Sequence, residues 1–279
     1  MDKLHVVPTI FRNLLVKTLI QWRAVAMLLV ALPYAYIMIQ GAILELGVPV
    51  HPVEPFMALM GGSGGSILVL CLLVLLSDAP FFDRNEALVA PRVGRWRWLF
   101  VRLGYLLAMC ALFLAFLAVL CLLLALPAMD WRASSLSEAT AMAFMVEAVE
   151  VAAMPPWWAF GCTFLLSWLG LAFFALLMFA VNMRYNQGMG LSVSFGLWVF
   201  SEFYFFMLST GGRDAWLSPL YSMLFFNQKT RYGGLAGVPL GFSLIYLGAL
   251  ALVLIAIIMA LTPGYPFPFV KGKDSGLNE

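Results

Sequence analysis

Six long apolar stretches constrain the fold of this chain more than any other feature. Each has roughly the 20 residues that a helix needs to cross the hydrocarbon core of a bilayer, which is about 30 Å thick. Only helices and closed barrels hydrogen-bond all their backbone groups in hydrocarbon. We therefore expect an all-α, polytopic membrane protein with six transmembrane helices, built as one transmembrane domain over residues 1–279. The expected spans cover residues 24–44, 56–76, 99–126, 157–181, 188–208 and 241–262.

The scarcity of charge agrees with lipid as the solvent. Apolar residues make up 63% of the chain and charged residues 11%, whereas soluble domains carry about 25% charged residues. So few charges cannot cover the surface of a soluble protein of this size, so membrane lipids are expected partners. The net charge of +2 is too small to indicate a nucleic acid partner, and none is expected.

The placement of Lys and Arg predicts the orientation. If both termini are cytoplasmic, twelve of the sixteen Lys and Arg residues face the cytoplasm and four face outside, as the positive-inside rule requires. The cytoplasmic charges then lie in residues 1–23, in the loop 77–98 with Arg102 just beyond it, at Arg184 and in the tail 263–279. This distribution favours a multi-pass protein of the plasma (inner) membrane. Six tryptophans near expected span ends are typical of interfacial rings: Trp22, Trp96, Trp98, Trp157, Trp158 and Trp216.

Apolar residues recur at intervals of three and four before the first span, as they do on one face of a helix. This face comprises Val7, Ile10, Phe11, Leu14, Leu15, Thr18, Leu19 and Trp22. We interpret residues 1–23 as an amphipathic helix that lies in the inner membrane interface. The alternative is that this segment prolongs the first span.

The passage SDAPFFDRNEALVAPRVGRWRW, residues 77–98, is a polar and basic interruption between two spans. Asp78, or Asp83 with Glu86 three residues later, can cap a short helix, and Gly94 suits its end. Such a helix combines apolar contacts with surrounding charges, which is typical of a small protein-docking surface. The apolar contacts are Phe81, Phe82, Leu88 and Val89, and the charges are Asp83, Arg84 and Glu86. The alternative is a loop held at anionic lipid headgroups by Arg92, Arg95, Arg97 and Arg102.

An amphipathic amino-terminal helix, six spans and this cytoplasmic loop together resemble the membrane subunits of ABC transporters of the second exporter type, the ABC type 2 permease family. The resemblance covers nearly the whole chain. It implies that the loop carries a coupling helix, which fits a groove on an ATPase subunit. The coupling residues would be Asp78, Pro80, Phe81, Phe82, Asp83, Arg84, Glu86, Leu88 and Val89.

The same resemblance implies partners, namely ABC ATPase subunits that carry ATP and Mg, and a second permease chain, either identical or related. The sequence contains no G-x-x-x-x-G-K-[ST] motif, so this chain cannot hold ATP phosphates by itself. We therefore expect no cofactor and no catalytic residue here, and ATP hydrolysis in the partner. The expected function is a permease subunit of an ATP-driven exporter that forms half of the translocation route.

Glu202 is the one acid well inside an expected span. A charged side chain in hydrocarbon is costly, so it should face protein, water or a partner chain. Together with the aromatic residues Trp198 and Tyr204, it is the candidate for the translocation route. The alternatives are that Glu202 packs in an interface or reaches water at the outer surface.

Two external loops are too long to be simple turns. Residues 134–158 contain Ser135 and Glu138 at the spacing of a capping box, which predicts a helix that lies on the outer leaflet before Pro155. The acids Glu138, Glu147 and Glu150 should face water there. Residues 209–240 mix an apolar middle with Gly and Pro breaks, as in a partly embedded hairpin.

Two other function classes compete with the exporter. A secondary transporter or channel usually has more polar residues within its spans, or broken helices in symmetric halves. An intramembrane enzyme needs catalytic side chains at reachable depth, whereas the spans hold no histidine and one deep acid. His5 and His51 lack the spacing of metal ligands and are expected at the surface, so no metal site is expected.

Overall fold

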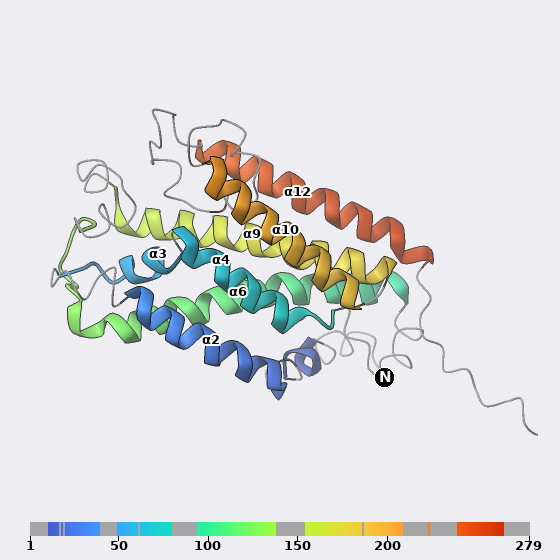
Figure 1. Ribbon diagram of the computed structural model, residues 1–279, viewed down its shortest axis with the longest axis horizontal. Helices are drawn as coiled ribbons and strands as arrows, with labels where there is room; N and C mark the ends of the chain where they lie inside the picture. Colours follow the sequence, from blue (N-terminus) through green and yellow to red (C-terminus); the bar gives the residue numbers. More distant parts are fainter. Residues whose placement is uncertain are drawn as a thin grey trace, which may run out of the picture.

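The computed structural model describes residues 11–16, 18, 20–39, 49–60, 62–79, 94–137, 154–185, 187–208, 223 and 239–264. These residues form a helical bundle (Figure 1). The long helices are α2 (Trp22–Ile39), α4 (Gly62–Leu76), α6 (Arg95–Ala125), α9 (Pro156–Arg184), α10 (Gln187–Leu208) and α12 (Leu240–Leu261), and the short ones are α3 (Glu54–Met60), η2 (Leu126–Ala128) and η6 (Thr262–Gly264). Within these residues, the β-pairing is an isolated bridge between Val50 and Met129. The expected all-α class is confirmed for this part of the chain.

Three helices of the described part are long and apolar enough to cross a membrane, namely α6, α9 and Leu240–Gly264. They coincide with the expected spans 99–126, 157–181 and 241–262. Helix α6 extends over 31 residues, or about 46 Å at 1.5 Å per residue, which exceeds the thickness of a bilayer core. Shorter apolar segments lie in α2, α4 and α10.

Consecutive long helices run in opposite directions along the bundle (Figure 1). Helices α2, α6 and α10 begin at the end where α4, α9 and α12 finish. We call this the basic end, because six of the described arginines belong to it: Arg12, Arg23, Arg95, Arg97, Arg102 and Arg184. Residues 49–54, 126–137 and 154–158 gather at the opposite end, which we call the capped end and which carries Arg132.

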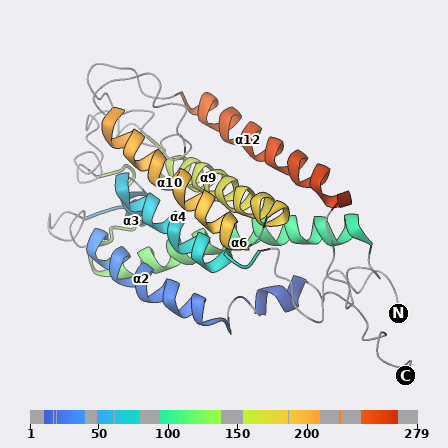
Figure 2. The same ribbon diagram turned by 45° about the vertical axis from the view of Figure 1, so that its right-hand side comes forward.

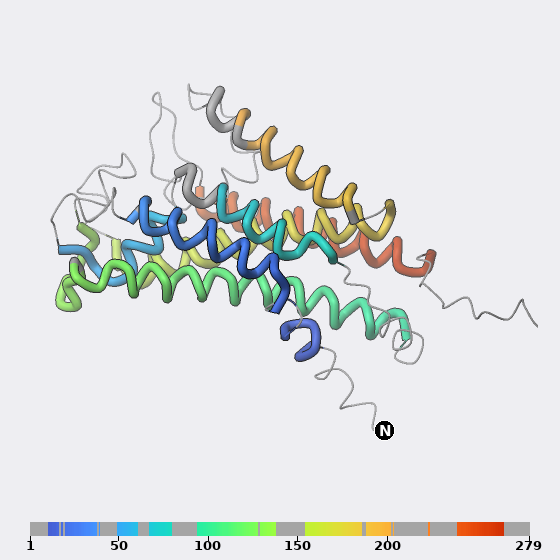
Figure 3. The backbone as a smooth tube through the Cα atoms, turned by 60° about the horizontal axis from the view of Figure 1, so that its bottom comes forward, coloured from blue at the N-terminus to red at the C-terminus, as the bar shows by residue number. Residues whose placement is uncertain are grey.

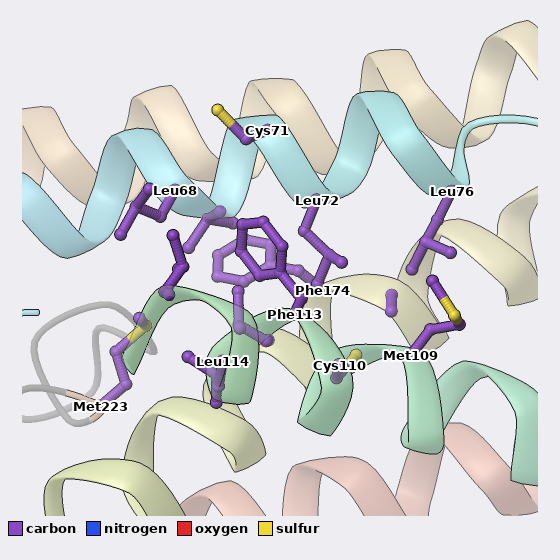
Figure 4. Packing of buried hydrophobic residues seen from close by; sticks show 14 of the residues in the cluster. Leu68, Cys71, Leu72, Leu76, Met109, Cys110, Phe113, Leu114, Phe174 and Met223 are labelled. Carbon is purple, nitrogen blue, oxygen red and sulfur yellow. The ribbon is translucent and has the colours of Figure 1, made fainter. Parts of the chain in front are cut away.

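Helix α9 lies at the centre of the bundle and packs against α4, α6, α10 and α12 (Figures 2 and 3). In Figure 4, Phe174 of α9 lies with Leu68 and Leu72 of α4 and with Phe113 of α6. All four side chains are buried. Large apolar side chains also cover outward faces, as Ile245 does on α12, and helices that are apolar all round are typical of membrane spans.

Tryptophan side chains mark both ends of the bundle. Trp22 and Trp96 are exposed at the basic end, and Trp157 and Trp158 are exposed at the capped end, as expected for interfacial rings. The same expectation is wrong for Trp98, which is 2% exposed. Two positions along a helix correspond to a rotation of about 200°, so Trp98 points into the bundle where Trp96 points away. Trp216 lies outside the described residues.

Candidate functional site

Residues 77–79, the first residues of the polar loop 77–98, form a turn that follows α4 and that we call the stem turn. The Ala79 N–H donates to the Leu76 carbonyl at 2.8 Å, and Ser77 Oγ donates to the Val74 carbonyl at 2.9 Å. These bonds satisfy carbonyls that a helix end leaves without intrahelical partners. The loop therefore starts from a fixed point at the basic end.

Asp78 in the stem turn faces the beginning of α2. Arg23 Nη1 lies 2.5 Å from Asp78 Oδ2, and the two side chains are 22% and 36% exposed. The Arg23 guanidinium also lies 5.9 Å from the centre of the Trp22 ring. Because both charges are partly hydrated, this ion pair orients the two segments more than it stabilises them.

Asn182, near the end of α9, joins the stem turn to α10. Its Nδ2 donates to the Ala79 carbonyl at 2.6 Å and approaches the Ser77 carbonyl at 3.5 Å. Its Oδ1 accepts from the Gly190 N–H at 2.9 Å. The side chain is 4% exposed, so water does not compete for these groups. One amide thus connects the ends of three helices.

Gly190 permits this connection because it lacks a side chain. A Cβ at this position would lie 2.0 Å from Asn182 Oδ1 and 2.5 Å from the Met178 carbonyl oxygen. Sequence reasoning missed both residues, because Asn182 falls just beyond the expected span 157–181 and resembled an ordinary polar residue at a span end. Gly190, a small residue in the first turn of the expected span 188–208, was the other signal that could have indicated this close contact.

The other end of the polar loop, at Gly94 and Arg95, is also fixed at the basic end, and we call it the second stem. Gly94 precedes α6 with a φ of +89°, a conformation that L side chains rarely adopt. In the next residue, Arg95 Nη1 donates to the Pro263 carbonyl in η6 at 2.5 Å. Both stems are therefore bonded to other helices. The remaining predicted coupling residues lie outside the described residues: Pro80, Phe81, Phe82, Asp83, Arg84, Glu86, Leu88 and Val89.

Arg102 corrects the expectation that four arginines of this region lie at lipid headgroups. Its side chain is 0% exposed, and its guanidinium lies 5.6 Å from the centre of the Trp98 ring. The reason is that α6 begins at Arg95, which places Arg102 two turns inside the helix and one turn beyond Trp98, on the same buried face.

Tyr105, one turn further along α6, contacts the amino-terminal segment. Its hydroxyl is hydrogen-bonded to Thr18 Oγ1, and its ring meets the Phe11 ring at a centroid distance of 5.8 Å. Residues 11–16 are helical, and Leu14 and Thr18 are buried. The predicted apolar face of this segment is therefore packed against protein at these positions.

Glu54 organises the capped end. Its side chain is 0% exposed and accepts from the His51 N–H at 2.6 Å, from the Ser137 N–H at 3.1 Å and from Ser137 Oγ. Its two carboxylate oxygens thereby join residues 49–54 to residues 126–137, two segments that are far apart in sequence. Sequence reasoning passed over Glu54 because it precedes the expected span 56–76.

His51 contradicts the expectation of a surface histidine, because it is 6% exposed. Its Nδ1 accepts from the Val53 N–H at 3.3 Å, and its ring packs edge to face on Trp157 at 5.6 Å. Burial lowers the pKa of His51, and the nearby Glu54 carboxylate opposes that change. His51, Glu54 and Ser137 do not form a catalytic triad, since the serine donates directly to the carboxylate and the imidazole Nδ1 is occupied by backbone.

The candidate route residues occupy the part of α10 remote from the stem turn. Trp198 is half-buried and stacks on Phe195 at 5.7 Å. Glu202 and Tyr204 lie in the last two turns of α10, but their side chains lie outside what the structure describes, as do Glu138, Glu147 and Glu150. The structure brings Asp78 together with Arg23, and it leaves the stem turn and the final turns of α10 at opposite ends of the bundle.

Among the described residues, no three His, Cys, Asp or Glu side chains come together as metal ligands do. Comparisons of the chain with protein-family models, with curated proteins and with solved structures find no match. The candidate site is the basic end, where the stem turn, Arg23, Asn182, Gly190 and Arg95 are brought together by the contacts described above.

Proposed function

We propose that this chain is the transmembrane permease subunit of an ATP-driven exporter of the ABC type 2 permease family. In this proposal α2, α3 with α4, and α10 cross the membrane together with α6, α9 and α12, which makes six spans. The basic end faces the cytoplasm at the plasma (inner) membrane, with both termini on that side. The alternating helix directions and the arginines gathered at one end support this orientation.

The observation that carries the proposal is the anchoring of both stems of the polar loop. Asn182 of α9 and Arg23 of α2 hold the stem turn, and Pro263 of η6 accepts from Arg95 at the other stem. A loop that is fixed at both stems by separate helices transmits a push to the bundle. A docking element driven by another protein needs this property.

In this proposal the functions are divided between this chain and its partners. The loop 77–98 docks into a groove of an ATPase subunit, which binds ATP and Mg. A second permease chain supplies the other half of the translocation route, for which Glu202, Tyr204 and Trp198 are the candidates here. This chain's part is mechanical, because it lacks the motif that holds nucleotide phosphates.

Co-purification tests the proposal. The tagged chain, extracted from its native membrane in mild detergent, should bring down a protein with the phosphate-binding motif, identified by mass spectrometry, together with ATPase activity. Phe81→Asp combined with Phe82→Asp should lower the recovery of that protein by about tenfold or more, because buried aromatic anchors dominate docking energies.

Phe81→Leu combined with Phe82→Leu is the matched control and should keep most of the recovery, because apolar area is conserved. Trp131→Asp changes an exposed aromatic residue at the capped end and should leave recovery unchanged. A stable chain that never brings down an ATP-binding protein contradicts the proposal. Equal recovery with the two aspartates would place the docking surface elsewhere.

A further inference from the structure

Asn182 hydrogen-bonds two helix ends, one of which presents a carbonyl group and the other an N–H group. The turn after α4 presents carbonyl groups, and Gly190 is among the first four residues of α10, whose N–H groups lack intrahelical acceptors. A side-chain amide has donors on one side and an acceptor on the other. Asn182 uses the donor for Ala79 and the acceptor for Gly190, so a single rigid group bridges α4 and α10 from its place in α9.

Burial makes this bridge strong relative to the other contact of the stem turn. With Asn182 at 4% exposure, breaking either bond leaves a polar group unsatisfied where water does not reach it, which is costly. The Arg23–Asp78 pair is partly hydrated, and water replaces such contacts readily. The stem turn therefore has a stiff connection to α9 and α10 and a compliant one to α2.

We propose that Asn182 is a positioning residue that makes the stem turn and the start of α10 move as one body. On the proposed function, on which this inference rests, a push on the polar loop displaces α9 and α10 together with α4. We call Asn182 and Gly190 together the joint. Gly190 is part of it because its missing side chain lets the amide of Asn182 reach the backbone of α10.

Hydrogen exchange of the full chain in lipid nanodiscs tests the joint without any partner. The amides of Ala79 and Gly190 report its two sides. Asn182→Leu keeps the size of the side chain and removes both bonds. Exchange should be about tenfold faster at Gly190, whose N–H loses its acceptor. It should also be faster at Ala79, whose N–H keeps the Leu76 carbonyl but whose own carbonyl loses its donor. Ser192→Ala removes a local bond to Gly188 within α10 and should leave the stem turn unchanged.

The decisive comparison is a double-mutant cycle. Gly190→Ala changes α10 only, yet it should speed exchange at Ala79 several-fold, because the new methyl group displaces the Asn182 amide. In the Asn182→Leu background, Gly190→Ala should add nothing at Ala79. Equal effects in the two backgrounds, or no effect at Ala79, would overturn the inference. If Asn182→Leu fails to fold, the response of Ala79 to Gly190→Ala alone still decides.

Repeating the exchange measurement in the assembly with the co-purified ATPase separates this inference from the proposed function. ATP with orthovanadate should change exchange at both Ala79 and Gly190 in the wild-type chain, and at Ala79 alone in Asn182→Leu. A wild-type assembly without any nucleotide response contradicts the proposed function, while the cycle in nanodiscs still judges the joint. A variant that responds on both sides overturns the inference.

Discussion

The two ends of the bundle are held together in different ways. At the capped end, one buried carboxylate, Glu54, collects backbone and hydroxyl donors from two connections. At the basic end, helix termini are linked by an ion pair, by the Asn182 amide, which joins three of them, and by Arg95, and most of the charges are exposed.

This difference assigns different mechanical roles to the ends. Opening the capped end requires uncovering an ionisable group that is 0% exposed, which costs several hydrogen bonds at once. At the basic end, the Arg23–Asp78 pair and the Arg95 bond are hydrated and separate from the Asn182 amide, so these two contacts can be exchanged without breaking it. We expect the capped end to behave as a fixed closure and the basic end as the responsive one.

Removing the carboxylate should have the largest effect. Glu54→Ala leaves the donors of His51 and Ser137 without their acceptor and should lower the free energy of unfolding by about 3–5 kcal/mol. Reversible unfolding in mixed micelles measures this loss. Glu54→Gln keeps one acceptor oxygen and should lose less. A Glu54→Ala chain as stable as the wild type would show that the capped end is not held by this group.

A methyl group at the joint of the basic end should come next. Gly190→Ala forces a side chain against Asn182 Oδ1 and the Met178 carbonyl and should cost about 2 kcal/mol of unfolding free energy. Gly196→Ala is the matched control on the same helix, because a Cβ there meets nothing within 4 Å. That control should be neutral or stabilising by up to about 1 kcal/mol. Equal losses for the two variants would mean that crowding at Asn182 is unimportant.

The ion pair of the basic end should contribute little. Arg23→Met should lower the free energy of unfolding by about 0.5 kcal/mol, because a partly exposed pair is weak. The wild type should lose a similar amount in 1 M KCl, at about 3 Å screening length, while Arg23→Met should not respond to salt. If Arg23→Met lost as much unfolding free energy as Gly190→Ala does, the Arg23–Asp78 pair would hold the stem turn as strongly as Asn182 does.

The smallest effect should be a pH dependence at the capped end. Because burial lowers the pKa of His51 from 6.5, the unfolded chain binds a proton there at a higher pH than the folded chain does. Stability from this group is therefore full above pH 6.5 and declines as the pH falls below it. His51→Asn keeps an acceptor for the Val53 N–H and should flatten this part of the curve of melting temperature against pH. Identical slopes would exclude His51 as the cause.

The sequence predicted those features of the fold that depend on local composition. Apolar runs identified α6, α9 and α12 because each run alone is long enough to span, and the arginines identified one end of the bundle. Glu54 and Asn182 could not be found this way. The partners of Glu54 include Ser137, 83 residues away, and Asn182 reaches a carbonyl 103 residues away, so their roles exist only after the helices have packed.

The same limit explains the errors at His51, Trp98 and Arg102. Each residue type is usually found at a surface or an interface, and each lies within five residues of the start of an expected span, 56–76 or 99–126. Trp98 and Arg102 are buried because their face of α6 meets other helices, and His51 is buried because its side of the segment before α3 meets neighbouring residues. Of the predicted coupling residues, Asp78 is placed at the basic end, and the docking role of the loop stays a prediction.

Gly94 has a consequence for how this chain tolerates substitution. Its backbone lies at φ +89° and ψ 145°, yet a Cβ there would touch nothing within 4 Å, so the whole penalty for any other residue comes from the main chain. In a saturation library, position 94 should accept glycine alone, while the nearby exposed positions 96 and 97 accept many residues. An exposed position with no neighbouring side chains would then tolerate as few substitutions as a buried core position does.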